Sequence, residues 1–156
     1  MEKGLVSIVT PCYNVEKFIF RLMDSILSQD YDKIEMITVD DGSKDNSKAV
    51  IESYIPRFEK RGYSLRYIKQ ENTGAGGALR NGLQYVNGEF LLWPDSDDFY
   101  ATNQTISKMV NVLANTSEEY SLVRVQEAFV DENTLERKRM AHSYKCPRLK
   151  HQENGR

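Results

Sequence analysis

The stretch GEFLLWPDSDD, residues 88–98, places three carboxylates within four residues directly after an apolar run of strand length. The nearly continuous apolar run predicts a strand that is buried on both faces, as in a parallel sheet. Ligands of open α/β sheets bind outside the carboxyl ends of the strands, so these acids are expected to face a ligand. Carboxylate oxygens without a nearby His or Cys favour Mg2+ or Mn2+ over zinc. An isolated Asp-x-Asp is more often a solvated loop with a helix cap, so the rest of the chain decides between the two interpretations.

Outward from this stretch, strand-like and helix-like segments alternate along the chain. β-branched or apolar runs predict strands, and apolar residues at three- and four-residue steps predict amphipathic helices. Strands are predicted at residues 5–10, 34–39, 65–69, 89–93 and 121–130, with a short one at 135–140. Helices are predicted at residues 15–29, 46–59, 79–86 and 105–113. This succession predicts an α/β fold with a mainly parallel, doubly wound sheet and helices on both faces.

Prolines and polar residues set the expected boundaries of these elements. Pro11 is expected to stop the first strand, and Pro56 to kink the second helix or end it early. The segment 65–69 alternates between apolar and polar residues, as a strand at a sheet edge does. Asn103 or Thr105 is expected to cap the last helix.

Length, charge and cysteine content limit the class of protein. The 156 residues predict one domain at 1–130, followed by a poorly structured or truncated tail at 131–156. The net charge is -2, so the protein lacks the excess of basic residues with which nucleic-acid binders neutralise phosphates, and no nucleic acid is expected as a partner. Cys12 and Cys146 form no C-x-x-C pair, which disfavours a zinc site, a disulfide framework and a Cys–His nucleophile. Because no export signal or transmembrane segment is recognisable, a cytoplasmic location is expected.

Residues 70–77 form a glycine-rich segment before a predicted helix. They are not a Walker A loop, because no Lys-Ser or Lys-Thr follows the glycines. They also follow the third strand, whereas the dinucleotide-binding fingerprint follows the first. A turn at a helix N-terminus, with Arg80 one turn in, can meet an anionic group through backbone N–H groups and the guanidinium. A tight turn with a solvated arginine is the alternative.

Four motifs occur in order along the first hundred or so residues: VSIVTPCYN at 6–14, VDDGS at 39–43, NTG with ALRNG within 72–82, and DSDD at 95–98. Together they resemble the family 2 inverting glycosyltransferases, which have the nucleotide-sugar-binding GT-A fold. The resemblance implies binding of a nucleotide diphosphate sugar, with a UDP-sugar favoured, for transfer to a saccharide or lipid-linked acceptor. It also implies a part in polysaccharide or glycoconjugate biosynthesis, with peripheral association at the inner face of the membrane.

The resemblance further assigns residues to the donor site. It implies that Asp41 accepts a hydrogen bond from uracil and that Arg80 approaches the base or the diphosphate. Asp97 and Asp98 are implied to hold the Mn2+ or Mg2+ that neutralises the charge on the leaving diphosphate. The other residues that the resemblance places at the donor site are Thr10, Pro11, Tyr13, Asn14, Asp40, Gly74 and Asp95.

The acids that follow Asp98 match no motif for a general base, although inversion by direct displacement requires one. The candidates for a base in this span are Glu118, Glu119, Glu127, Asp131, Glu132 and Glu136. The chain is therefore expected to be the donor-binding portion of a glycosyltransferase, with its base unidentified. The alternative is a catalytically inactive nucleotide-binding module of the same fold, used for regulation or assembly. Glucose, galactose, N-acetylhexosamine and rhamnose donors, and any oligomeric state, are all compatible with the sequence.

Overall fold

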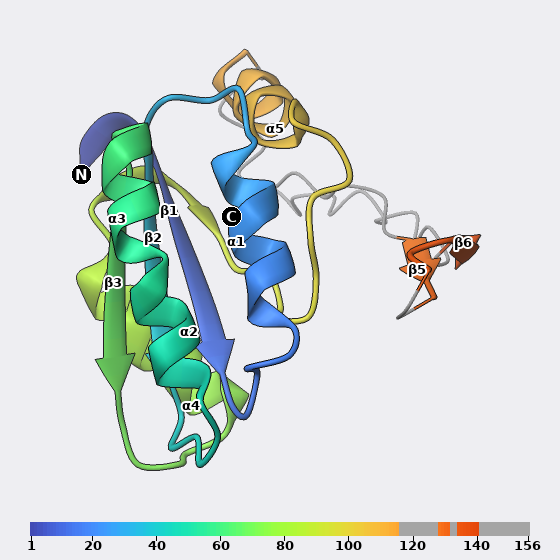
Figure 1. The fold of residues 1–156 in the computed structure, drawn as a ribbon. Coiled ribbons are helices and arrows are strands. Elements are labelled where there is room, and N and C mark those ends of the chain that lie inside the picture. Colours follow the sequence, from blue (N-terminus) through green and yellow to red (C-terminus); the bar gives the residue numbers. More distant parts are fainter. Residues whose placement is uncertain (116–127, 132–133, 141–156) are drawn as a thin grey trace, which may run out of the picture.

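The computed structural model describes residues 1–115, 128–131 and 134–140 (Figure 1). Its centre is a four-stranded sheet in the order β3-β2-β1-β4. All three strand pairs are parallel, which confirms the predicted α/β fold. The strands are β1 (Glu2–Cys12), β2 (Ile34–Asp40), β3 (Ser64–Lys69) and β4 (Gly88–Leu92).

Helices cover both faces of this sheet. One face packs against α1 (Ile19–Leu27), α2 (Ser47–Ser53), α3 (Ile55–Arg61) and α5 (Thr105–Ala114). The other face packs against α4 (Ala75–Gly82), which continues as the short 3-10 helix η1 (Leu83–Tyr85). Figure 1 shows α1 to α3 in front of the sheet and α4 behind it. Because the side chains of a strand alternate between faces, β1 contributes Val6 and Ile8 to the first core and Val9 to the second.

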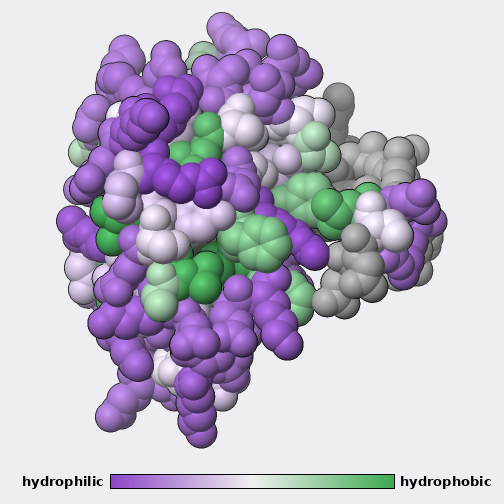
Figure 2. Space-filling model, in the orientation of Figure 1, coloured by the Kyte–Doolittle hydropathy of each residue, from purple (hydrophilic) through white to green (hydrophobic). Residues whose placement is uncertain are grey.

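Helix α1 supplies the largest apolar stripe to the first core. Ile19, Leu22, Met23 and Ile26 recur at three- and four-residue steps and have no exposed surface. Full burial of each such side chain contributes about 1.5–3 kcal/mol. On the face drawn in Figure 2, hydrophilic residues cover most of the surface, and hydrophobic ones show in smaller patches, several of them near its centre. The stripe therefore fixes α1 against the sheet.

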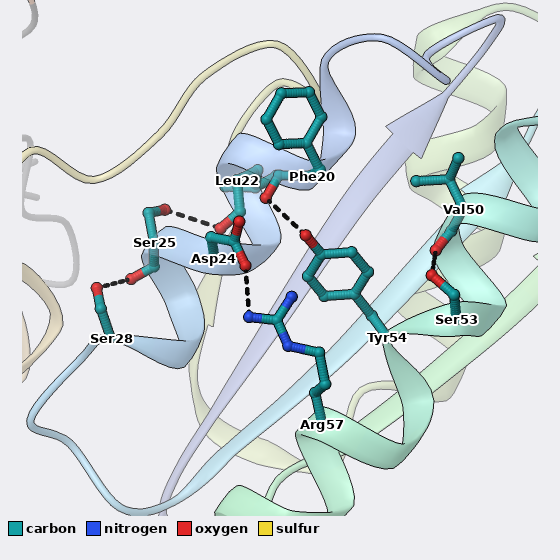
Figure 3. Close-up of polar contacts among 9 residues, drawn as sticks. All are labelled: Phe20, Leu22, Asp24, Ser25, Ser28, Val50, Ser53, Tyr54 and Arg57. Atoms are coloured by element: carbon teal, nitrogen blue, oxygen red, sulfur yellow. Dashed lines mark hydrogen bonds and ion pairs between the residues drawn. The ribbon is translucent and has the colours of Figure 1, made fainter.

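Pro56 divides the predicted helix at 46–59 into α2 and α3. It lies in the first turn of α3, where its missing N–H has no helical partner to lose. Arg57 then reaches across to α1 and forms an ion pair with Asp24 at 2.7 Å (Figure 3). The Arg57 guanidinium also lies 4.5 Å from the ring centroid of Tyr54, whose hydroxyl donates to the Phe20 carbonyl at 3.5 Å. These contacts set the position of α3 relative to α1.

The prediction that Pro11 stops the first strand is wrong, because β1 runs through it to Cys12. The Cys12 carbonyl accepts a hydrogen bond from the Asp41 N–H at 2.8 Å on the β2 side. Successive residues of a strand direct their backbone polar groups to opposite neighbours, so Pro11 faces the β4 side. The pairing of β4 ends there at Leu92, opposite Ile8. The missing N–H of proline therefore interrupts no strand pairing.

Two further expectations differ from the structure. The strand at 88–92 is only partly buried at Phe90, Leu91 and Leu92, because β4 forms an edge of the four-stranded sheet in the described residues. Neither Asn103 nor Thr105 caps α5. The buried side chain of Gln29 does so from the end of α1, since its Oε1 accepts a hydrogen bond from the Ile106 N–H at 3.0 Å.

The described part of the C-terminal region is an antiparallel pair, β5 (Ala128–Val130) with β6 (Arg137–Met140). It forms a sheet separate from the parallel one, so the strand predicted at 121–130 is confirmed only over its last three residues and does not extend the main sheet. The predicted tail at 131–156 contains the short strand expected near 135–140, and its remaining residues lie largely outside the description. Within the described part of the chain, none of the helices has both the length and the apolar character needed to cross a membrane.

Candidate donor site

The four loops that follow the parallel strands meet at the carboxyl edge of the sheet. Three of them, together with the start of α4, surround a pocket of about 220 Å³. Its lining residues are Pro11, Cys12, Tyr13, Asp41, Ala75, Asp95, Ser96 and Asp97. Five of the predicted donor-site residues are thus brought together from segments that are far apart in sequence. The Tyr13 side chain is 49% exposed, which leaves its ring accessible from the pocket.

The loop after β1 is tied to the loop after β2. Asn14 has a positive φ of 53°, a conformation that asparagine adopts more readily than most residues. Its N–H donates to Ser43 Oγ at 2.9 Å, and its Oδ1 accepts from the Lys44 N–H at 2.9 Å. Asn14 therefore shapes the pocket without lining it. Thr10 also lies off the pocket, and its buried Oγ1 has no hydrogen-bond partner within the described residues.

The two aspartates that end β2 have different environments. Asp40 is 1% exposed, and its carboxylate accepts hydrogen bonds from the Ser43 N–H at 2.7 Å and from the Tyr67 hydroxyl. Burial, together with the adjacent Asp40 carboxylate, raises the pKa of Tyr67, which stays a neutral donor. Asp40 thus anchors the turn after β2 to β3 and does not line the pocket.

Asp41 lines the pocket and holds the glycine-rich loop. Its Oδ1 accepts from Gln70 Nε2 at 2.7 Å and from the Thr73 N–H at 2.8 Å, and its Oδ2 accepts from the Gly74 N–H at 2.7 Å. Burial opposes ionisation, but hydrogen bonds from Thr73, Gln70 and Gly74 outweigh it and lower the pKa of Asp41 below its ordinary value. At neutral pH this side chain is a carboxylate, which accepts hydrogen bonds and donates none.

Glycines allow the loop to close onto α4. Gly74 has a φ of 80°, which a residue with a side chain rarely adopts, and it directs its N–H to Asp41. A Cβ on Gly77 would lie 2.7 Å from the Thr73 Cβ and closer still to its Oγ1. The bare backbone at position 77 therefore gives Thr73 room to remain beside Asp41.

Arg80 lies beside a second, neighbouring pocket. This pocket has a volume of about 290 Å³ and is lined by Gln70, Glu71, Thr73, Gly77, Arg80, Asn81 and Gln84. Arg80 is thus absent from the lining of the first pocket, which holds the acids. Gln70 and Thr73 line the second pocket and hold Asp41, so the two pockets share a wall.

Both the sequence and the fold of the chain are similar to those of known proteins. The family model described as glycosyl transferase family 2 matches residues 7–155, nearly the whole chain. The chain belongs to glycosyl transferase family 2. An uncharacterized glycosyltransferase of Rickettsia felis is 36% identical over 130 residues, which are 82% of this chain and 20% of that relative.

Solved structures of GT-A glycosyltransferases share the fold of this family 2 chain. S. aureus TarS in complex with UDP-GlcNAc matches it with a TM-score of 0.63 and 29% identity, over 70% of this chain and 31% of that one. The mannosyltransferase PcManGT from Pyrobaculum calidifontis, in complex with GDP-Man and Mn2+, matches with a TM-score of 0.65 and 27% identity. That match covers 73% of this chain and 33% of PcManGT. The chain thus spans between a fifth and a third of the length of these relatives.

The acids after β4 in this family 2 domain suit a metal that is shared with a ligand. Asp95 and Asp97 line the first pocket, and the Asp98 N–H donates to the Asp95 carbonyl at 3.2 Å. Burial, and after it the charge of Asp98, raises the pKa of Tyr100, so this phenol stays protonated at neutral pH. No three His, Cys, Asp or Glu side chains converge on one point within the described residues. Mg2+ and Mn2+ accept that arrangement, because one or two carboxylates, substrate phosphates and waters complete their coordination.

Two residues in the pocket walls had been assigned no role in the donor site, although Cys12 lies in the first motif and Gln70 begins the glycine-rich segment. Cys12 lines the first pocket, and burial followed by the Asp40 charge raises the pKa of its thiol to about 12. It therefore stays protonated and offers neither a nucleophile nor a thiolate ligand. Gln70 contacts Asp41 from the end of β3. The sequence signal for it was its position directly after a strand, at the start of the glycine-rich segment.

None of the candidate general bases that the structure describes lies at the pocket. Glu118, Glu119, Glu127 and Glu132 lie outside the described residues. Asp131 forms an ion pair with Lys138 at 2.9 Å in the β5–β6 segment, and Glu136 is exposed there. Neither of these two lines the pocket at the carboxyl edge of the parallel sheet.

Proposed function

We propose that this chain binds the nucleotide diphosphate sugar of a glycosyltransferase in the pocket at the carboxyl edge of its parallel sheet. The observation that carries the proposal is the convergence of Tyr13, Asp41, Asp95 and Asp97 from three separate loops on that pocket. Ligands of open α/β sheets bind at this edge. TarS with UDP-GlcNAc and PcManGT with GDP-Man are similar chains in complex with such donors, which supports the same ligand class here.

The base of the donor is expected between Tyr13 and Asp41. An ionised Asp41 accepts hydrogen bonds only, so it favours a base with a ring N–H, which uracil and guanine have and cytosine lacks. The exposed ring of Tyr13 offers a face for stacking. Asp41 would therefore favour UDP over CDP, and it would accept GDP as well. A UDP-sugar stays the favoured donor through family likeness.

The diphosphate is expected beside Asp95 and Asp97, with Mn2+ or Mg2+ shared between these carboxylates and the phosphate oxygens. Asp98, at the next position of the loop, is a further ligand expected for the same metal. A metal at this point would neutralise the charge that builds on the leaving nucleoside diphosphate. Because the first pocket is smaller than the roughly 300–1,000 Å³ of most small-molecule sites, we expect the ligand to extend past the shared wall toward Arg80.

The reaction of the whole enzyme would be transfer of the sugar, with inversion, to a saccharide or lipid-linked acceptor. Such a step needs a carboxylate to deprotonate the acceptor hydroxyl. We assign this chain the donor half of the reaction, in cytoplasmic polysaccharide or glycoconjugate synthesis near the membrane surface.

Calorimetric titration of the chain with UDP, GDP and CDP tests the proposal. With Mn2+ present, UDP and GDP should bind, and CDP should bind about tenfold or more weakly, the equivalent of one hydrogen bond to a charged group. Asp41→Asn should remove most of this discrimination, because an amide can donate to the ring nitrogen of cytosine. Equal affinity for UDP and CDP in the unaltered chain would show that Asp41 does not contact the base.

A further inference from the structure

Three polar side chains form a continuous chain of hydrogen bonds behind the first pocket. Asn81 Nδ2 donates to Gln70 Oε1 at 2.7 Å. Gln70 Nε2 in turn donates to Asp41 Oδ1 at 2.7 Å and to Thr73 Oγ1 at 2.6 Å. The chain links helix α4, the end of β3 and the end of β2. It also uses both ends of the Gln70 amide.

The order of donors in this chain follows from its anchor on α4. A primary amide has a donating NH2 end and an accepting oxygen end, and rotation by 180° exchanges them. Because Asn81 presents its NH2 to Gln70, the oxygen of Gln70 is held on the α4 side. The NH2 of Gln70 is consequently directed at Asp41 Oδ1, where its reversal would place two oxygens in contact.

The anchor itself is rigid. Asn81 precedes Gly82, where a Cβ would lie 3.0 Å from Val39 Cγ2 and closer still to Val9 Cγ1. Backbone of α4 thus lies directly on β1 and β2 at this point. The position of Asn81 is set by the sheet, and the hydrogen-bond chain transmits that position to the loop.

Asp41 is left with unequal oxygens. Oδ1 accepts from Gln70 Nε2 and the Thr73 N–H, with a longer contact of 3.4 Å from Thr73 Oγ1. Within the described residues, Oδ2 accepts only from the Gly74 N–H. A carboxylate oxygen has two lone pairs, so Oδ2 retains one for a further donor. Since Asp41 lines the first pocket, that donor can come from a bound ligand.

We propose that Asn81 and Gln70 are positioning residues for base selection: Asn81 orients the Gln70 amide, which together with the Thr73 N–H saturates Oδ1 of Asp41 and leaves Oδ2 for the N–H of the nucleobase. This inference rests on the proposed function, because the ligand in question is the nucleotide of that proposal. Neither amide contacts the base. They act through Asp41. The orientation of its carboxylate is fixed by the Gln70 amide and by the N–H groups of Thr73 and Gly74.

Two neutral variants of similar size test this role. Gln70→Met removes both donors to the loop, and Asn81→Leu removes only the group that orients Gln70. Gln70→Met should weaken UDP binding about tenfold, as expected for loss of a hydrogen bond to a charged group, and should narrow the preference for UDP over CDP. Asn81→Leu should act in the same direction by a smaller factor, because the Gln70 amide becomes free to reverse.

A double-mutant cycle tests whether Asn81 acts through Gln70. In the Gln70→Met background, Asn81→Leu should change UDP affinity by less than about twofold, since the amide it orients is gone. Asn111→Leu is the matched control. Asn111 accepts from Asn115 Nδ2 at 2.6 Å in an exposed amide pair on α5, so its loss should leave UDP affinity unchanged.

Amide hydrogen exchange in the nucleotide-free chain gives a second readout that does not depend on the ligand. Both variants should speed exchange at the Thr73 and Gly74 N–H groups, which donate to Asp41, while amides of β2 keep their wild-type rates. Additive effects in the cycle, or unchanged exchange at Thr73 and Gly74, would overturn the positioning role. Failure of the unaltered chain to bind any nucleotide would instead overturn the proposed function, and the exchange rates would still decide whether the chain of hydrogen bonds orders this turn.

Discussion

Substitution of Gly82 by alanine tests the close approach of α4 to the sheet. A Cβ at this position would lie 3.0 Å from Val39 Cγ2 and still closer to Val9 Cγ1. Both valines are fully buried on neighbouring strands, and β-branched side chains have few alternative rotamers. The added methyl group can be accommodated only if α4 moves away from β1 and β2.

Two opposing effects set the size of the change. Overpacking in a core typically costs about 1–3 kcal/mol, whereas alanine in place of glycine favours a helix by roughly 0.5–1 kcal/mol. We expect Gly82→Ala to lower the free energy of unfolding by about 1–2 kcal/mol in total. Because α4 also carries Asn81, the displaced helix should weaken UDP binding as well.

Urea unfolding of the chain, followed by circular dichroism, measures this difference. Gly76→Ala is the matched control, since it lies on the same helix and a Cβ there would meet no atom within 4 Å. The control should be stabilised by up to about 1 kcal/mol. If Gly82→Ala were stabilised to the same extent, α4 would not lie directly on the two valines, and the anchor inferred for Asn81 would be lost with it.

Three further substitutions test the closure of the glycine-rich loop, the proposed metal ligand Asp97 and the hydrogen bonds of Glu35 at the start of β2. Gly77→Ala should displace Thr73 from Asp41 and weaken UDP binding about tenfold in calorimetry, and wild-type affinity would contradict the tight loop closure. Asp97→Ala should abolish the enhancement of UDP affinity by Mn2+, measured against EDTA; an unchanged enhancement would exclude Asp97 as a ligand. Glu35 accepts hydrogen bonds from Ser7 at 2.5 Å and from the Asn87 N–H at 2.7 Å; burial raises its pKa, but these bonds outweigh burial and lower it below 4.5. The stabilisation by the ionised Glu35 is fully present above pH 4.5 and is lost as the pH falls through the lowered pKa. Glu35→Gln should therefore lower the free energy of unfolding by about 1–3 kcal/mol at pH 7 and by progressively less in acid. A difference in unfolding free energy that does not depend on pH would refute this role of Glu35.

Local patterns were sufficient for the order of the elements. Apolar runs and three- and four-residue spacings predicted the parallel strands and the helices between them, and Pro56 predicted a kink or an early end of the helix that the structure divides in two. Acids at the ends of β2 and β4 were expected near a ligand, and Asp41, Asp95 and Asp97 do line one pocket. These features are local because a strand or helix buries one face of its own sequence, and the period of that face is written along the chain.

Tertiary structure alone decided which polar groups pair with one another. Asp40 and Asp41 are adjacent and chemically identical in sequence, yet one is held by Tyr67 and the other by the glycine-rich loop. Gln29 caps a helix that begins more than seventy residues later, and Gln70 is oriented by Asn81 across a loop. The physical reason is that a hydrogen bond depends on distances of about 3 Å and on the direction of the donor, which only the packed arrangement of helices on the sheet defines. Sequence thus determined where the pocket lies, and packing determined which side chains face into it.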